Sequence, residues 1–247
     1  MATPRFKLLY VCNGNSARSP LAAACSSQIL SAKPDSVIWE IESAGTHTLP
    51  DDLMQPDAVK AASQMDIDIS DHRPSPLSAD QCGDPDLILA MSWDQVSHIW
   101  SFVPEAWDRV FTIKEFVHWA QRAPVRPPIL FSDRLEAMRD TIIQAHSIRK
   151  RARADYGFWG GIRPQDLNLI EPNGKGEEAW AALANAVHAL VSDAIMLLRG
   201  PEHQEARPLA VKAVKAAKTR KAAKTRKAAK THKAGARRSP ARAKARR

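Results

Sequence analysis

Residues 7–20 read Lys-Leu-Leu-Tyr-Val-Cys-Asn-Gly-Asn-Ser-Ala-Arg-Ser-Pro, and this stretch decides the fold. The apolar run that ends at Cys12 predicts a buried strand, and the Asn-Gly-Asn that follows predicts a tight loop. Ser19 is a good N-cap and Pro20 suits the first helical position, so a helix is expected from there through Leu30. The chain thus opens with a strand, a tight loop and a helix in immediate succession.

The same alternation continues along the chain. Apolar runs predict strands at residues 37–43, 86–91 and 109–112, and helical patterns cover residues 57–65, 93–102, 132–154 and 177–198. Alternating strands and helices with apolar strand runs indicate a parallel sheet that is covered on both faces. We therefore expect one α/β domain over residues 1–200. It would contain a helical insertion at about 121–165, with a Pro-rich loop at 123–128.

Residues 201–247 differ sharply from the rest in composition. Between Arg207 and Arg247 there are 17 Lys and Arg residues and no Asp or Glu, whereas the first 206 residues carry a net charge of −8. Three successive Lys- and Ala-rich hexads occupy residues 215–232. Because like charges at this density cannot pack into a core, we expect a disordered tail. It either contacts nucleic acid or another polyanion through counterion release, or it serves as a solubilising terminus.

Composition excludes several classes of protein. Three cysteines make no disulfide framework, the first residues lack the apolar region of a signal peptide, and no stretch reaches about 18 uninterrupted apolar residues. We expect no membrane span and a cytoplasmic protein, with nucleoid association as a role for the tail. A reducing cytosol would keep a reactive thiol available.

The chemistry is expected in the loop from Cys12 to Arg18, where the spacing is Cys-x5-Arg-Ser. Gly14 and its two Asn neighbours tolerate left-handed backbone, so consecutive N–H groups can curl into an anion-binding nest at the positive end of the following helix. Arg18 offers a planar fork for two phosphate oxygens. In such a field Cys12 should be a thiolate, which favours in-line attack on phosphorus and a phosphocysteine intermediate.

This loop resembles the active-site loop of the low-molecular-weight protein tyrosine phosphatase family. Further stretches resemble that family in the same order: Ser43-Ala-Gly-Thr46, Ile67 to Arg73, the strand at 86–91, and Phe111 to Phe116, a segment of actinobacterial-type members. The resemblance covers about residues 5–198 and leaves out the tail. It implies a flavodoxin-like sheet of four parallel strands with helices on both faces, no metal or other cofactor, and hydrolysis of a phosphorylated protein or small phosphomonoester.

The resemblance also implies roles for particular residues. Ser19 would donate a hydrogen bond to the thiolate, and Asn15 would brace the loop. Ser43 and His72 would support the loop from outside. The residues expected to contact phosphate are Asn13, Gly14, Asn15, Ser16, Ala17 and Ser19.

The leaving oxygen needs a proton donor, which the family takes from an Asp-Pro loop before the last helix. This sequence has Glu171-Pro172 there, so Glu171 is the expected general acid and Asp166 is the alternative. The longer side chain can displace the carboxyl by about an ångström, which costs on the order of a hundredfold in rate. Asn173 and Gly174 replace the aromatic residues that the family carries after Asp-Pro.

Three other functions remain open on the residues alone. Arsenate reductases share this fold and can carry Ser at the position of Ser16. Cys25 and Cys82 are expected too far from Cys12 to resolve an arsenate adduct, so a small external thiol would have to serve. Arginine phosphatases of the same family carry Thr at that position. A noncatalytic protein would use the loop to sense an anion and the tail to bind nucleic acid.

Overall fold

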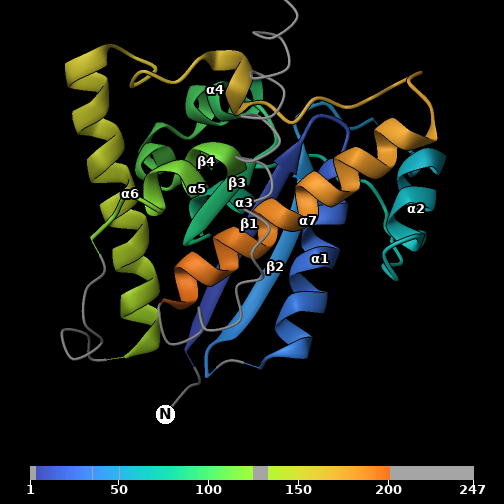
Figure 1. Ribbon diagram of the computed structural model, residues 1–247, viewed down its shortest axis with the longest axis horizontal. Coiled ribbons are helices and arrows are strands. Elements are labelled where there is room, and N and C mark those ends of the chain that lie inside the picture. Colours follow the sequence, from blue (N-terminus) through green and yellow to red (C-terminus); the bar gives the residue numbers. More distant parts are fainter. Residues whose placement is uncertain (1–3, 35, 50, 125–132, 201–247) are drawn as a thin grey trace, which may run out of the picture. The chain divides into compact units, whose positions relative to one another are not determined.

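The computed structural model of the protein describes residues 4–34, 36–49, 51–124 and 133–200. The chain divides into two units, Met1–Gln204 and Glu205–Arg247, and all described residues lie in the first. Within these residues the centre is a sheet of four parallel strands in the order β2-β1-β3-β4 (Figure 1). The expected flavodoxin-like α/β fold is confirmed. The strands are β1 (Arg5–Cys12), β2 (Ile38–Gly45), β3 (Leu87–Ala90) and β4 (Val110–Thr112).

The strands are apolar on both sides because alternate residues meet different helix layers. In β1, Phe6, Leu8 and Tyr10 join one core cluster, whereas Leu9 and Val11 join a second cluster on the opposite face. Each of the five is at most 1% exposed. Burial on both faces explains why this strand reads as a continuous apolar run.

Helices cover the two faces of the sheet (Figure 1). One set of helices closes the cluster that contains Phe6 and Tyr10, and a second set closes the cluster that contains Leu9 and Val11. A 3-10 turn, η3 (Pro164–Leu167), precedes the last helix. The first face carries α1 (Arg18–Ala32), α2 (Pro56–Ser63), α5 (Ile113–Ala120), α6 (Arg134–Tyr156) and α7 (Glu177–Arg199), and the second carries α3 (Ala79–Gly83), α4 (Trp93–Phe102) and η1 (Pro104–Asp108).

The last helix, α7, contacts α1, α2, α5 and α6. Of the helices in the described ranges, it alone is long and apolar enough to cross a membrane by length and composition. Its apolar side chains are used in the core of this unit, which accounts for their number. The buried ones include Trp180, Leu183, Val187, Val191, Ile195 and Leu198.

The first helix begins earlier than expected. α1 starts at Arg18 with Ala17 as its N-cap and without a side-chain cap, so the prediction of Ser19 as N-cap is wrong. The Ser19 hydroxyl is directed at Cys12 instead. Pro20 lies within the first turn, where a missing N–H costs no helical hydrogen bond.

Two short helices, α3 and α5, have no counterpart in the sequence-based prediction. α3 begins with a capping box between Ser78 and Gln81, a signal that the sequence carries. α5 follows β4 directly, with the Thr112 hydroxyl accepting from Glu115 N, so no turn residues separate the strand from the helix. The other predicted elements agree with the structure to within two residues at their ends. Most of the Pro-rich loop and the whole tail lie outside the described residues.

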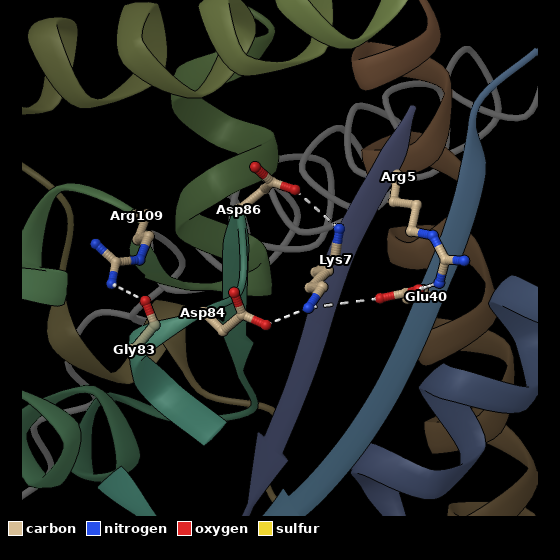
Figure 2. A network of polar contacts seen from close by, with 7 residues as sticks. All are labelled: Arg5, Lys7, Glu40, Gly83, Asp84, Asp86 and Arg109. Atoms are coloured by element: carbon tan, nitrogen blue, oxygen red, sulfur yellow. Dashed lines mark hydrogen bonds and ion pairs between the residues drawn. The ribbon is translucent and has the colours of Figure 1, made fainter. Parts of the chain in front are cut away.

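A polar network joins the elements at the edge of the sheet where the strands begin (Figure 2). The Lys7 amide donates to Asp86 Oδ2 over 2.9 Å, and the Lys7 ammonium pairs with Asp84 and, at 3.7 Å, with Glu40. Arg5 also pairs with Glu40. Exposed ion pairs add little to the free energy of unfolding, so this network mainly aligns β1 with its neighbours.

Candidate active site

The loop between β1 and α1 lies at the opposite edge of the sheet, where the strands end. Within the described residues, the amides of residues 14–17 have no protein acceptor, whereas carbonyl oxygens of the loop are bound from outside. A loop whose carbonyls are bound by the protein and whose amides are left free has the polarity of an anion-binding nest. The outer bonds run from Thr46 N to Cys12 O (3.0 Å), from His47 N to Asn13 O (2.8 Å) and from Gln55 N to Ser16 O (2.9 Å).

Gly45 lets the loop lie against the end of β2. A Cβ at this position would sit 2.7 Å from Asn13 O and 2.8 Å from Asn15 N, both of them backbone atoms. Gly45 also pairs in register with Cys12. Only glycine therefore allows this close approach. The Ser43-Ala-Gly-Thr46 motif contains this glycine, but its residue types alone do not explain why glycine is required there.

Asn15 holds the loop in shape. Its φ of 50° lies in the left-handed region, and its side chain is fully buried. Its Nδ2 donates to Ser19 Oγ (3.0 Å) and Ser43 Oγ (2.9 Å), and its Oδ1 accepts from His72 Nε2 and Ser75 N, both at 2.9 Å. The structure thus brings Asn15, Ser19, Ser43 and His72 together as expected, and it adds Ser75, which the sequence did not single out.

His72 contributes to this network as a neutral donor. Burial lowers the pKa of His72, and this effect outweighs the hydrogen bond to Asn15, which raises it. Because Asn15 Oδ1 can only accept, the proton of the neutral ring lies on Nε2. The amide of Asn15 is then fully used, which fixes the orientation of its side chain.

Ser19 connects this network to the sulfur. Its hydroxyl accepts from Asn15 Nδ2 and donates to Cys12 Sγ over 3.0 Å, with Ala44 O as a longer alternative at 3.4 Å. Both Ser19 and Cys12 are at most 1% exposed. A hydroxyl proton aimed at sulfur stabilises a thiolate more than a thiol, and the N-terminus of α1 acts in the same direction.

Arg18 joins the loop to the segment before α7. Its Nη1 donates to Leu169 O over 2.9 Å, and its Nη2 lies 2.8 Å from Glu171 Oε2. The Arg18 side chain is 8% exposed, and its Nε has no partner among the residues described. An arginine that is buried at a nest and retains a free N–H is well placed to bind an anion there.

The segment that carries Glu171 is anchored to the end of β3. Leu169 N donates to Met91 O over 2.8 Å, and Trp93 N donates to Asn168 Oδ1 over 2.9 Å. Asp166 lies just before these anchors, but its carboxylate is held by Arg163 at 2.8 and 3.0 Å. Of the two acids considered from the sequence, the structure brings only Glu171 to Arg18.

Three exposed apolar side chains lie on segments that contact the loop or Arg18. Leu49 and Leu53 lie on the segment 46–55 that binds the loop carbonyls, and Ile170 precedes Glu171. These three side chains are 67%, 78% and 69% exposed. Exposed apolar side chains near an anion site suit a ligand whose anion is attached to an apolar group.

The other cysteines do not assist Cys12. Cys25 and Cys82 are both free and buried, and burial raises the pKa of Cys25 to about 12 and that of Cys82 to about 11. Cys82 lies in α3, which precedes β3 and so stands at the edge of the sheet where the strands begin. No group of three or more His, Cys, Asp or Glu side chains in the described ranges could hold a metal ion.

A family model described as low molecular weight phosphotyrosine protein phosphatase matches residues 7–154. The chain belongs to this family. Membership makes it a protein-phosphatase-type hydrolase with a cysteine nucleophile. The match ends before Glu171, so the position of the acid rests on the contacts around Arg18.

Two relatives and one solved structure show the extent of the similarity to this phosphatase family. The chain is 34% identical over 110 residues to a protein-arginine-phosphatase of Bacillus subtilis, covering 44% of this chain and 71% of that protein. It is 34% identical over 145 residues to a probable low molecular weight protein-tyrosine-phosphatase, EpsP, of Ralstonia solanacearum, covering 59% and 96%. The low molecular weight protein tyrosine phosphatase of T. tengcongensis aligns with a TM-score of 0.54 at 25% identity, covering 77% and 97%.

Proposed function

We propose that this phosphatase hydrolyses phosphotyrosine in proteins, with Cys12 as nucleophile, Arg18 as phosphate ligand and Glu171 as general acid. The observation that carries the proposal is the position of Arg18. It follows the Cys12 loop directly in the chain, and it lies 2.8 Å from the Glu171 carboxylate. Nucleophile, anion ligand and proton donor therefore converge on one site.

In the first step, the Cys12 thiolate attacks phosphorus while the bond from phosphorus to the tyrosine oxygen breaks. The amides of residues 14–17 and the Arg18 guanidinium bind the nonbridging oxygens, whose charge must be stabilised in the transition state. Protonated Glu171 gives its proton to the leaving oxygen. Tyrosine departs with its hydroxyl restored, and the enzyme holds a phosphocysteine and a Glu171 carboxylate.

In the second step, the Glu171 carboxylate accepts a proton from a water molecule whose oxygen attacks phosphorus. The bond between sulfur and phosphorus breaks, inorganic phosphate forms, and the electron pair returns to Cys12 as a thiolate. The Ser19 hydroxyl, 3.0 Å from Sγ, stabilises that leaving group. Glu171 is then protonated and ready for the next substrate.

The apolar side chains beside the loop favour an aryl ester. Leu49, Leu53 and Ile170 can pack against a tyrosine ring, although Asn173 and Gly174, which directly follow Pro172, are not aromatic. Phosphoarginine is a second candidate, because the chain resembles a protein-arginine-phosphatase over its N-terminal part. Arsenate reduction with an internal resolving thiol is disfavoured, since Cys25 and Cys82 are both buried and burial raises the pKa of each.

Hydrolysis of p-nitrophenyl phosphate, a phosphotyrosine peptide and a phosphoarginine peptide tests the proposal. Wild type should hydrolyse the first two, and Cys12→Ser should abolish both activities. Glu171→Gln should lose more rate on phosphotyrosine than on p-nitrophenyl phosphate, because p-nitrophenolate leaves without help from an acid. Glu178→Gln, which removes an exposed carboxylate on α7, is the matched control. Faster hydrolysis of phosphoarginine than of phosphotyrosine would overturn the substrate assignment.

The charge pattern suggests a partner for the rest of the chain. We propose that residues 1–200 form the catalytic domain and that residues 201–247 form a tail that binds nucleic acid, placing the enzyme in the cytoplasm at the nucleoid. The 17 Lys and Arg residues between Arg207 and Arg247 support this. Binding of the full chain to a DNA duplex should weaken with salt, and changing three tail lysines to Gln should reduce the slope of log K against log salt by about 2 to 3. Absence of binding at low salt would contradict the proposal.

A further inference from the structure

A hollow of about 510 Å³ lies next to the segment that carries Glu171. It opens between the first turns of α5 and the 3-10 turn η3, at the edge of the sheet where the strands end. The catalytic steps above use none of its side chains. Those that matter here are Lys114, His118, Ile162, Arg163, Asp166 and Leu167.

Lys114 supplies a positive charge to this hollow. Its Nζ donates to Asn168 O over 2.6 Å, and no carboxylate lies within ion-pair distance among the described residues. Burial lowers the pKa of Lys114, and the charge of Asp166 opposes that effect. A partly buried ammonium with one hydrogen bond keeps two donors for a ligand.

The other polar groups do not cancel this charge. Arg163 and Asp166 pair through two contacts, at 2.8 and 3.0 Å, and so neutralise one another. His118 lies one turn after Lys114 on α5. Burial and the charge of Arg122 lower the pKa of His118, so it is neutral at pH 7 and can donate one hydrogen bond. The polar lining therefore carries a net positive charge, which selects an anion.

The hollow is close to the site of hydrolysis. Lys114 follows the end of β4, which lies two strands from β1 in the sheet, so the two strand ends that lead into these sites are roughly 10 Å apart. About three residues of extended peptide span that distance. Asn168, which Lys114 binds, is followed by Leu169, whose carbonyl accepts from Arg18.

We propose that this hollow is a subsite that binds the carboxylate of an acidic residue near the phosphotyrosine of the substrate protein, with Lys114 as its cation. This inference rests on the proposed phosphotyrosine hydrolysis. A free carboxylate in solution has the same chemistry and is the other source that the test must separate.

The test compares phosphotyrosine peptides in which one Glu is moved along an otherwise neutral sequence. The readout is the ratio of kcat/KM for each peptide to that of its partner with Gln at the same position. In wild type this ratio should rise by about fivefold at one position, the value for a single well-placed ion pair. Working at about 0.15 M salt limits the effect of distant charges.

Lys114→Gln should bring the ratio at that position to one, and Lys114→Arg should retain most of it. Lys150→Gln, which removes an exposed charge from α6, is the matched control and should keep the ratio. Because the ratio compares two peptides on one variant, a general loss of rate from the broken Lys114–Asn168 bond does not affect it.

A ratio near one at every position, with both peptides hydrolysed in a Cys12-dependent way, would overturn the subsite and leave the phosphatase standing. Loss of Cys12 dependence would instead remove the proposed function, and the subsite with it. If added succinate changes p-nitrophenyl phosphate turnover in wild type but not in Lys114→Gln, while the peptide ratios stay at one, the hollow binds a free carboxylate. That outcome would overturn the proposal that the hollow binds an acidic residue of the substrate protein.

Discussion

Arg18 Nη2 lies 2.8 Å from Glu171 Oε2, so the guanidinium that should bind phosphate already holds a carboxylate. A phosphate dianion that enters the nest competes for the same N–H groups and repels Glu171. Entry of phosphate should therefore displace the Glu171 carboxylate from Arg18, a contact that depends on the reach of the Glu171 side chain.

The first prediction concerns that reach. Glu171→Asp shortens the side chain by one methylene and should weaken the contact with Arg18. For Glu171→Asp we expect a lower KM for p-nitrophenyl phosphate, because the shorter carboxylate competes less with phosphate for the Arg18 guanidinium. Glu171→Gln removes the proton donor and should lower kcat on phosphotyrosine by about 10²- to 10⁴-fold. Steady-state kinetics on both substrates checks this. A KM that rises in Glu171→Asp would show that Glu171 does not compete with phosphate.

Asn15 provides the second prediction. Asn15→Ala leaves the Ser75 amide and the His72 ring without an acceptor and forces Ala into the left-handed region. We expect the free energy of unfolding to fall by about 3 kcal/mol. Asn15→Gly loses the same bonds without the backbone penalty, so it should be more stable than Asn15→Ala by about 1 kcal/mol. Urea unfolding measures both, and equal stability of the two would contradict the strain argument.

Gly45 provides the third. In Gly45→Ala the new Cβ would meet the loop backbone at 2.7 and 2.8 Å, so the nest must shift. Overpacking of this kind costs about 1–3 kcal/mol in stability, and the displaced amides should raise KM for p-nitrophenyl phosphate. Gly83→Ala is the matched control, since nothing lies within 4 Å of its Cβ. A Gly45→Ala enzyme with wild-type KM would show that the loop tolerates the contact.

The strand, loop and helix start around Cys12 were predictable because they lie in one short stretch. A strand, a Gly-Asn loop and a helix start are local signals, and the spacing from Cys12 to Arg18 is fixed by the loop between them. The contact from Arg18 to Glu171 spans 153 residues and depends on how the segment before α7 is anchored to β3. The sequence could propose Glu171 beside Asp166, but only the folded arrangement separates them.

The features that the sequence could not predict also depend on contacts between segments that are distant in the chain. Ser75 contributes through its backbone amide, for which the residue type gives no signal. The requirement at Gly45 comes from the approach of another chain segment. The start of α1 was misplaced because the Ser19 hydroxyl, a good cap by type, serves Cys12 instead. At functional sites, local preference gives way to tertiary contacts.

The fourth prediction concerns stability in acid. His146 Nδ1 lies 2.8 Å from Arg149 Nη2, a donor, so it must accept and the ring must be neutral. Burial, and then the charge of Arg149, lower the pKa of His146 to about 4. Below pH of about 6.5 the unfolded chain binds a proton at His146 that the folded chain does not bind until near pH 4. As the pH is lowered from about 6.5 to about 4, the free energy of unfolding should therefore fall.

Urea unfolding at pH 7 and 4.5 measures this loss of stability. His146→Gln should lose less stability between these two pH values than wild type does, and His188→Gln on α7 is the control. Equal slopes in wild type and His146→Gln would contradict the assignment.

The last prediction follows from the isolation of Cys12. Hydrogen peroxide should oxidise the Cys12 thiolate to sulfenic acid with release of water, and a nearby thiol would normally trap that state as a disulfide. Residue 17 is Ala, Cys25 is buried with its pKa raised to about 12, and Cys82 stands at the other edge of the sheet. A second peroxide should therefore oxidise Cys12 to sulfinic acid, so that dithiothreitol does not restore activity.

Bound phosphate should slow the loss of activity in peroxide. Ala17→Cys should make part of that loss reversible, because it places a thiol next to the loop. Full recovery of the oxidised wild type in dithiothreitol would show that another group protects Cys12.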